Sequence, residues 1–290
     1  MSEPTPARIG YTVVGGFLGA GKTTWLNRRL EQADGRRLAV VVNDFADVNV
    51  DAALLGARTT AAGGRIVELT NGCACCTAGS SLSLTLRDLA TGVDGPVPDE
   101  IVVEASGAAD PAVIAGYGSR RVMTEASVVV LVDATRVTAL LQDTRVSRVV
   151  AAQIVAATDI EYSRLDLASS AEIEGAVEAV DAVRDEAARR GVGGSAHASG
   201  TDFVTASFDL PVTDLDELPA AVDRGVREIV TAAGITRMLR VKGIVSTPDG
   251  HVVVQAVSDG ELDIEPFDDG SDDSTEAVGR VVVIGTTAPD

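Results

Sequence analysis

Three cysteines stand within four positions of this chain, and the chain has no others. Cys73, Cys75 and Cys76 belong to the stretch NGCACC at residues 71–76. Thiolates are soft ligands that suit Zn²⁺ and also accept Co²⁺ or Ni²⁺. In an extended segment Cys73 and Cys75 face the same way and Cys76 does not, so a tetrahedral site needs a turn or a ligand from elsewhere. Redox chemistry and a structural cluster without chemistry are the alternatives to a metal site.

A glycine-rich segment near the N-terminus has the residue types of a phosphate-binding loop. Residues 16–23 read GFLGAGKT, which fits the pattern G-x-x-x-x-G-K-[ST]. Glycines let backbone N–H groups approach phosphates, Lys22 reaches the β- and γ-phosphates, and the Thr23 hydroxyl can bind Mg²⁺. The candidate nucleotide-binding residues of this segment are Gly16, Gly19, Ala20, Gly21, Lys22, Thr23 and Thr24. A glycine-rich turn between a strand and a helix, without a ligand, is the alternative.

Lysine is rare in this chain, and its use therefore carries information. Of 24 basic residues, two are lysines, Lys22 and Lys242. Because the chain otherwise uses arginine, a lysine indicates a chemical requirement. For Lys242 the sequence leaves two interpretations open, a lysine at a sheet edge and part of a surface that docks another protein.

Acidic residues follow several apolar segments. Asp44 and Asp47 come after LAVVVN, Glu104 ends IVVE three residues before Gly107, and Asp133 ends VVVLVD. Such a carboxylate can hold Mg²⁺ or orient an attacking water, and the Gly107 N–H can contact a γ-phosphate. We expect Lys22, Glu104 and Gly107 to be the catalytic group, with Thr23 and Glu104 as Mg²⁺ ligands. Solvated loop acids are the alternative.

The elements that must position these residues are buried strands alternating with helices. Continuous apolar runs are typical of a parallel sheet covered on both faces, whose ligands lie beyond the carboxyl ends of the strands. The expected strands lie at 9–15, 37–45, 65–72, 100–107 and 127–136, and the expected helices at 25–32, 81–91, 167–190 and 214–234. The fold class is therefore α/β, with a mostly parallel sheet covered by helices.

A different pattern begins near residue 236. Alternating apolar residues interrupted by PDG and SDG predict hairpins over 238–267, and residues 279–287 predict a last strand. We expect a phosphate-loop domain over residues 1–210 and a small α+β domain over residues 236–290.

Composition limits the partners. The formal net charge of −19 argues against nucleic acid and anionic membrane surfaces, which require clusters of Lys and Arg. No apolar run is long enough to span a membrane, and the N-terminus lacks the apolar core of a signal peptide. With an odd number of cysteines, these features predict a cytoplasmic protein.

Four stretches together resemble the CobW-type family of GTP-dependent metal chaperones, relatives of the GTPases that insert nickel into urease and hydrogenase. They are GGFLGAGKTT at 15–24, NDFADVNVD at 43–51, NGCACC at 71–76 and EASGAADP at 104–111. Their order and spacing match, and the resemblance extends over nearly the whole chain. It implies a GTPase domain, a small C-terminal domain, a switch segment at Asn43–Asp47, and metal binding that involves Cys75 and Asp47. It also implies a client metalloprotein and a nucleotide-dependent homodimer.

The chain departs from the family pattern at three places. Where the guanine-reading N-K-x-D motif is expected, residues 163–166 read SRLD. Asp166 can still accept hydrogen bonds from guanine N1 and N2, and Arg164 can cover the base as lysine would. Val42 replaces an acid that some members carry before the switch. The two histidines, His197 and His251, are too few for bulk metal storage and are expected to be ordinary residues.

We therefore expect a GTPase that uses GTP and Mg²⁺ to control the transfer of Zn²⁺, or of Co²⁺ or Ni²⁺, to a client protein. A kinase that phosphorylates a small molecule, with structural cysteines, is one alternative. A metal or nucleotide sensor with little turnover is the other.

Overall fold

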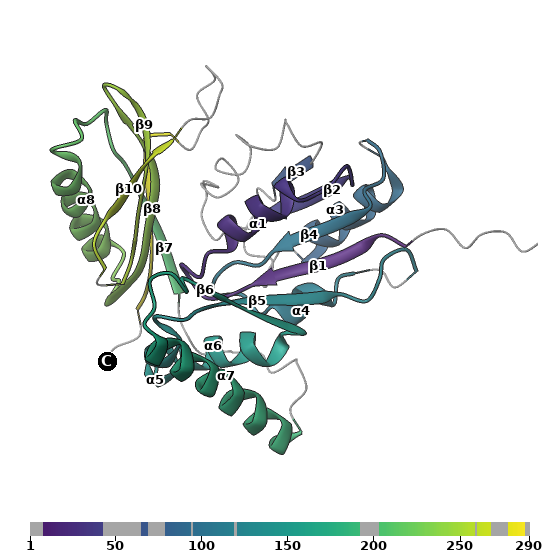
Figure 1. Cartoon of the computed structure of the whole chain (residues 1–290). Coiled ribbons are helices and arrows are strands. Elements are labelled where there is room, and N and C mark those ends of the chain that lie inside the picture. Colours follow the sequence, from purple (N-terminus) through teal and green to yellow (C-terminus); the bar gives the residue numbers. More distant parts are fainter. Residues whose placement is uncertain are drawn as a thin grey trace, which may run out of the picture.

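Two β-sheets organise this chain in the computed structural model (Figure 1). The structure describes residues 8–42, 65–68, 79–93, 95–118, 121–191, 203–258, 260–267 and 278–287. The first sheet is parallel and the second is antiparallel. In the described part, no helix is long and apolar enough to cross a membrane.

The first sheet has six strands in the order β3-β2-β4-β1-β5-β6. The strands are β1 (Gly10–Gly15), β2 (Leu38–Val42), β3 (Arg65–Glu68), β4 (Glu100–Glu104), β5 (Ser127–Asp133) and β6 (Asp159–Ser163). Each residue of β2 and β4 is buried, as expected for strands covered on both faces. The parallel, helix-covered sheet predicted from the apolar runs is thereby confirmed.

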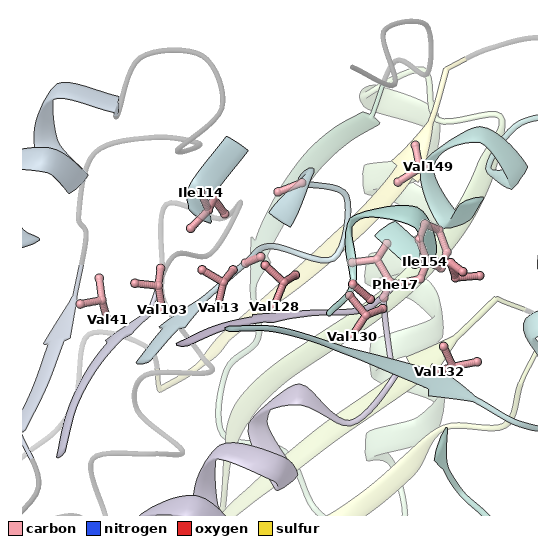
Figure 2. Packing of buried hydrophobic residues seen from close by; sticks show 14 of the residues in the cluster. Val13, Phe17, Val41, Val103, Ile114, Val128, Val130, Val132, Val149 and Ile154 are labelled. Atoms are coloured by element: carbon pink, nitrogen blue, oxygen red, sulfur yellow. The ribbon is translucent and has the colours of Figure 1, made fainter. Parts of the chain in front are cut away.

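Helices cover both faces of this sheet. They are α1 (Lys22–Glu31), α3 (Gly79–Thr91), α4 (Pro111–Ala115), α5 (Val137–Gln142), α6 (Ser147–Ala156) and α7 (Ser170–Arg190). Because strand side chains alternate, Val14 packs with Leu26 of α1 on one face, while Val13 belongs to the core of the other face. In Figure 2, Val41, Val103, Val13 and Val128 form a row across four strands, with Ile114 of α4 over them.

The strand register brings the carboxyl ends of the central strands together. Val14 of β1 and Val42 of β2 are both aligned with Glu104, the last residue of β4. Asp133 of β5 is aligned with Ser163 of β6. The chain therefore leaves the sheet at one edge with its polar residues side by side, where ligands of parallel sheets bind.

The second sheet has the order β10-β9-β8-β11-β7. Its elements are β7 (Phe203–Asp209), α8 (Leu218–Ala232), β8 (Arg237–Thr247), β9 (Gly250–Val257), β10 (Asp263–Phe267) and β11 (Arg280–Thr286). Helix α8 packs on the face that points away from the first sheet (Figure 1). The predicted hairpins and final strand match β8, β9, β10 and β11.

The second sheet includes a strand upstream of the expected domain boundaries. Strand β7 lies within residues 1–210, which the sequence assigned to the first domain, yet it pairs with β11 in the second sheet. Arg280 of β11 donates to Asp209 of β7 at 2.9 Å. The partner strand lies about seventy residues downstream, so no local pattern could reveal this pairing.

The two sheets contact each other directly. The core cluster beside the first sheet also contains Leu239, Ile244, Val282 and Ile284 of the second. At the rim, Arg237 at the start of β8 pairs with Asp143 after α5. These contacts fix the second sheet across the carboxyl edge of the first (Figure 1).

Candidate nucleotide-binding site

The predicted phosphate loop joins β1 to α1 in the expected strand–loop–helix arrangement. Lys22 is the first residue of α1 and is 6% exposed, and its Nζ donates to the Gly16 carbonyl oxygen at 2.9 Å. The Ala20 N–H donates to the Phe17 carbonyl oxygen at 3.0 Å, which closes a turn inside the loop. The lysine therefore folds over a loop that ends at the N-terminus of α1, where the helix dipole favours a bound anion.

A cleft of about 610 Å³ opens between this loop and the second sheet. The phosphate-loop residues that line it are Gly19, Gly21, Lys22, Thr23 and Thr24. Among the described residues, its basic side chains are Lys22, Arg28, Arg164, Arg240 and Lys242, and its acidic ones are Glu31, Glu104, Glu261, Asp263 and Glu265. A volume of this size lies within the range of small-ligand sites.

Glu104 reaches the same cleft from the end of β4 and is 4% exposed. Together with Thr23 it supplies a hydroxyl and a carboxylate oxygen, the ligand type that Mg²⁺ prefers. The donor set therefore fits Mg²⁺. Thr23 would bind the ion directly and Glu104 would hold the ion or its water shell. A bound Mg²⁺ would neutralise charge on the phosphates.

Gly107 does not line the cleft among the described residues, but it packs against the loop that does. A side-chain carbon added at Gly107 would lie 2.5 Å from Leu18 Cδ2 and 2.9 Å from the Leu18 backbone nitrogen. Gln153 of α6, which the sequence did not single out, donates to the carbonyl oxygens of Gly107 and Ala109 at 3.0 Å each. Nothing local in the sequence distinguishes this buried glutamine.

The segment expected to read the base follows β6. Arg164 lines the cleft and has a φ of 56°, and its Nε lies 3.3 Å from Asp133 Oδ2. Asp133 also accepts from the Thr135 N–H and hydroxyl at 3.0 and 2.6 Å. Asp133 thus fixes Arg164 and its own turn. Asp166 is exposed and is not among the cleft residues.

One arginine connects the phosphate loop to the second sheet. Arg136, beyond the end of β5, donates to the Leu18 carbonyl oxygen at 3.3 Å and to the Ser258 hydroxyl at 3.4 Å. Burial lowers the pKa of the Arg136 guanidinium, an effect that nearby Asp133 opposes. Beside it, a side-chain carbon on Gly19 would lie 2.5 Å from Val257 Cγ1. The end of β9 therefore touches the loop, and glycine is required at position 19.

The remaining predicted phosphate-loop residues lie behind the cleft. Gly16 supplies the carbonyl that Lys22 binds, and Ala20 is buried in the core beneath α1. Neither is among the cleft residues that the structure describes. Gly16 and Ala20 therefore shape the loop and do not form the surface of the cleft.

The predicted metal ligands Cys73, Cys75, Cys76 and Asp47 lie outside the described residues, as does His197. Within the described ranges, no group of three or more His, Cys, Asp or Glu side chains could hold a metal ion. His251 of β9 lies 3.2 Å from the Ser246 hydroxyl through its Nδ1, a cross-strand contact. The expectation that His251 is an ordinary strand residue stays a prediction.

The family model for the CobW/HypB/UreG nucleotide-binding domain matches residues 10–189, well over half of the chain. The chain belongs to this family. Zinc chaperone CobW of Pseudomonas aeruginosa is 43% identical over 112 residues, 37% of this chain and 29% of that protein. Zinc chaperone YjiA of Escherichia coli is 36% identical over 171 residues, 57% of this chain and 52% of that protein.

The CobW/HypB/UreG match ends before the second sheet begins at β7. The aligned parts span about half or less of the length of these two curated relatives. A solved structure titled Zn(II)-bound YjiA GTPase from E. coli aligns with 97% of this chain and 95% of that chain, at 20% identity and a TM-score of 0.42.

Proposed function

We propose that this protein hydrolyses GTP and uses the nucleotide state to control the binding and delivery of Zn²⁺. The observation that carries the nucleotide half is the convergence of Lys22, Thr23 and Glu104 in one cleft of a CobW/HypB/UreG family member. The cysteines of NGCACC, with Asp47, are the proposed ligands of the transported metal. Two relatives that are named zinc chaperones support zinc over Co²⁺ or Ni²⁺.

Hydrolysis at this site depends on positioning and charge. The N–H groups at the start of α1 and the Lys22 ammonium stabilise the charge on the β- and γ-phosphates. Glu104 is the proposed group that orients the attacking water or the Mg²⁺ shell. The Gly107 N–H is the proposed γ-phosphate contact, held in place by its packing against Leu18.

Guanine is the proposed base. Arg164 enters the cleft beside the loop, and a side-chain carbon on Gly21 would lie 3.8 Å from Ser163 Cβ, so this segment borders the nucleotide site. Asp166 is the proposed acceptor for guanine N1 and N2. It is two residues from Arg164, which lines the cleft.

We further propose a cytoplasmic location, a client metalloprotein as the recipient and a nucleotide-dependent homodimer as the working form. The homodimer is tested by measuring the molar mass in solution with GDP and with a non-hydrolysable GTP analogue. A monomer in both nucleotide states would contradict the proposed homodimer.

The function itself is tested by nucleotide turnover. Purified protein with Mg²⁺ should hydrolyse GTP in preference to ATP, and Lys22→Ala should abolish this. Turnover that requires a small-molecule acceptor and is unchanged by Cys75→Ser would favour a kinase. Nucleotide binding without turnover, with metal and client present, would favour a sensor.

A further inference from the structure

The second sheet presents a polar face to the phosphate loop. Val241 and Val245 of β8 pack in the core with α8, while Arg240 and Lys242, which alternate with them, line the cleft. Lys242 is 7% exposed. It lies on β8, the third of five strands, so the interpretation as a lysine at a sheet edge is wrong. Its burial in the cleft also speaks against an outward docking surface.

Both lysines of this chain line the same cleft, one on each wall. Lys22 begins α1, and Lys242 comes from a strand 220 positions later. The other 22 basic residues of the total of 24 are arginines. An ammonium is a compact charge with three rotatable donors, which suits the oxygens of a phosphate. Because the chain otherwise uses arginine, the presence of both lysines in one cleft indicates that this cleft requires the ammonium group.

The charge of the cleft differs from that of the chain. Five basic and five acidic side chains line it among the described residues, whereas the whole chain has 24 basic and 43 acidic residues. The acids of β10 lie two strands away from β8. One of them, Asp263, accepts a hydrogen bond from Gln255 of β9 at 3.3 Å, and Gln255 is the register partner of both Lys242 and Asp263. The β8 side of the wall is therefore the cationic one.

The second sheet is held against the loop by contacts at the end of β9. Val257 packs against Gly19, and Ser258 accepts from Arg136, which also binds the Leu18 carbonyl. Arg240 is the register partner of Val257, and Lys242 is the next residue of β8 on the same face. The basic side chains of β8, Arg240 and Lys242, therefore begin beside the phosphate loop.

We propose that Lys242, supported by Arg240, contacts the terminal phosphate of a nucleoside triphosphate bound at the phosphate loop. The second sheet thereby distinguishes the triphosphate from the diphosphate. This inference rests on the proposed nucleotide-binding function and adds a residue from outside the matched family domain. A cation that approaches the γ-phosphate from another structural unit adds charge-assisted hydrogen bonds that disappear with that phosphate.

The wild-type protein allows a direct test, because lysine labelled with ¹³C at Cε gives two side-chain signals. Lys242→Arg assigns them. We expect GDP to shift the Lys22 signal and leave the Lys242 signal, and a non-hydrolysable GTP analogue to shift both. Equal effects of the two nucleotides on Lys242, or none, would overturn the inference and leave the proposed function standing. Two signals that respond to neither nucleotide would overturn nucleotide binding and the inference with it.

Affinity gives a second test. Lys242→Gln should weaken the GTP analogue about 10- to 100-fold, the range of one to two lost charge-assisted hydrogen bonds, and change GDP affinity less than about twofold. Arg224→Gln, an exposed charge removal on α8, is the matched control and should change neither. Lys242→Arg should keep part of the preference. If Lys242→Gln does not fold, Arg240→Gln is measured in its place. An equal loss for both nucleotides, or no loss, contradicts the proposal.

Discussion

The backbone of Gly107 lies directly against Leu18, so the loop after β4 and the phosphate loop are packed together without room for one methyl group. This contact joins two of the sequence stretches that carry the family resemblance.

Gly107→Ala should therefore disturb the site. The added carbon would meet a backbone nitrogen, which cannot move aside as a side chain can. We expect a loss of about 1–3 kcal/mol in the free energy of unfolding and reduced GTP turnover. Urea unfolding and a phosphate-release assay measure the two effects.

Gly175→Ala is the matched control. This glycine lies in α7, and its added carbon would meet Thr138 Oγ1 at an ordinary 3.9 Å. A helical glycine replaced by alanine should gain up to about 1 kcal/mol of stability and leave turnover unchanged. If Gly107→Ala and Gly175→Ala have the same stability and the same GTP turnover, the close contact at Gly107 does not contribute to function.

Gln153→Leu should loosen the same loop from behind. The substitution leaves the buried carbonyl groups of Gly107 and Ala109 without their donor, at about 1–3 kcal/mol for each unsatisfied group. We expect lower stability in urea and a lower kcat, with the largest change in amide hydrogen exchange over residues 105–109. Stability within about 0.5 kcal/mol of wild type would show that these hydrogen bonds are not needed.

Asp166→Ala should lower the preference for GTP over ATP. A carboxylate that accepts from guanine N1 and N2 contributes about 1.5–3 kcal/mol per hydrogen bond, so the ratio of affinities should fall at least about tenfold. Asp185→Ala, an exposed acid on α7, is the control for the loss of charge. An unchanged ratio of GTP affinity to ATP affinity would show that Asp166 does not recognise the base.

Acid should weaken the pair formed by Arg37 and Asp99 near the starts of β2 and β4. The hydrogen bonds and charge of Arg37 lower the pKa of Asp99 from 3.8 to about 2. Because the folded-state pKa is the lower one, the stabilisation is complete above pH 3.8 and is lost as the pH falls through about 2. An NMR titration of the Asp99 carboxyl carbon should show the low midpoint. In Arg37→Gln the midpoint should return toward 3.8, and a wild-type midpoint near 3.8 would contradict the pairing.

Much of the first sheet could be predicted because its signals are local. The phosphate loop is one continuous motif between a strand and a helix. Glu104 could be placed near Lys22 because parallel strands end at the same edge. The capping box of Ser169 and Glu172 is also local, and it begins α7 within the predicted helix.

The rest depends on contacts between distant segments. The pairing of β7 with β11 and the position of Gln153 behind Gly107 are set by packing that no short pattern encodes. The rarity of lysine was visible in the sequence. That Lys242 meets Lys22 across a cleft follows only from the second sheet lying against the phosphate loop.

The central claim is that nucleotide state and metal affinity are coupled, and one titration tests it most directly. Zn²⁺ affinity is measured with GDP and with a non-hydrolysable GTP analogue, with Cys75→Ser as the control that removes a proposed ligand. Coupling free energies of about 1–3 kcal/mol predict Zn²⁺ affinities that differ about 5- to 150-fold between the two states, and GTP affinity should change by the same factor when Zn²⁺ is added. Equal Zn²⁺ affinity in both nucleotide states would contradict the account.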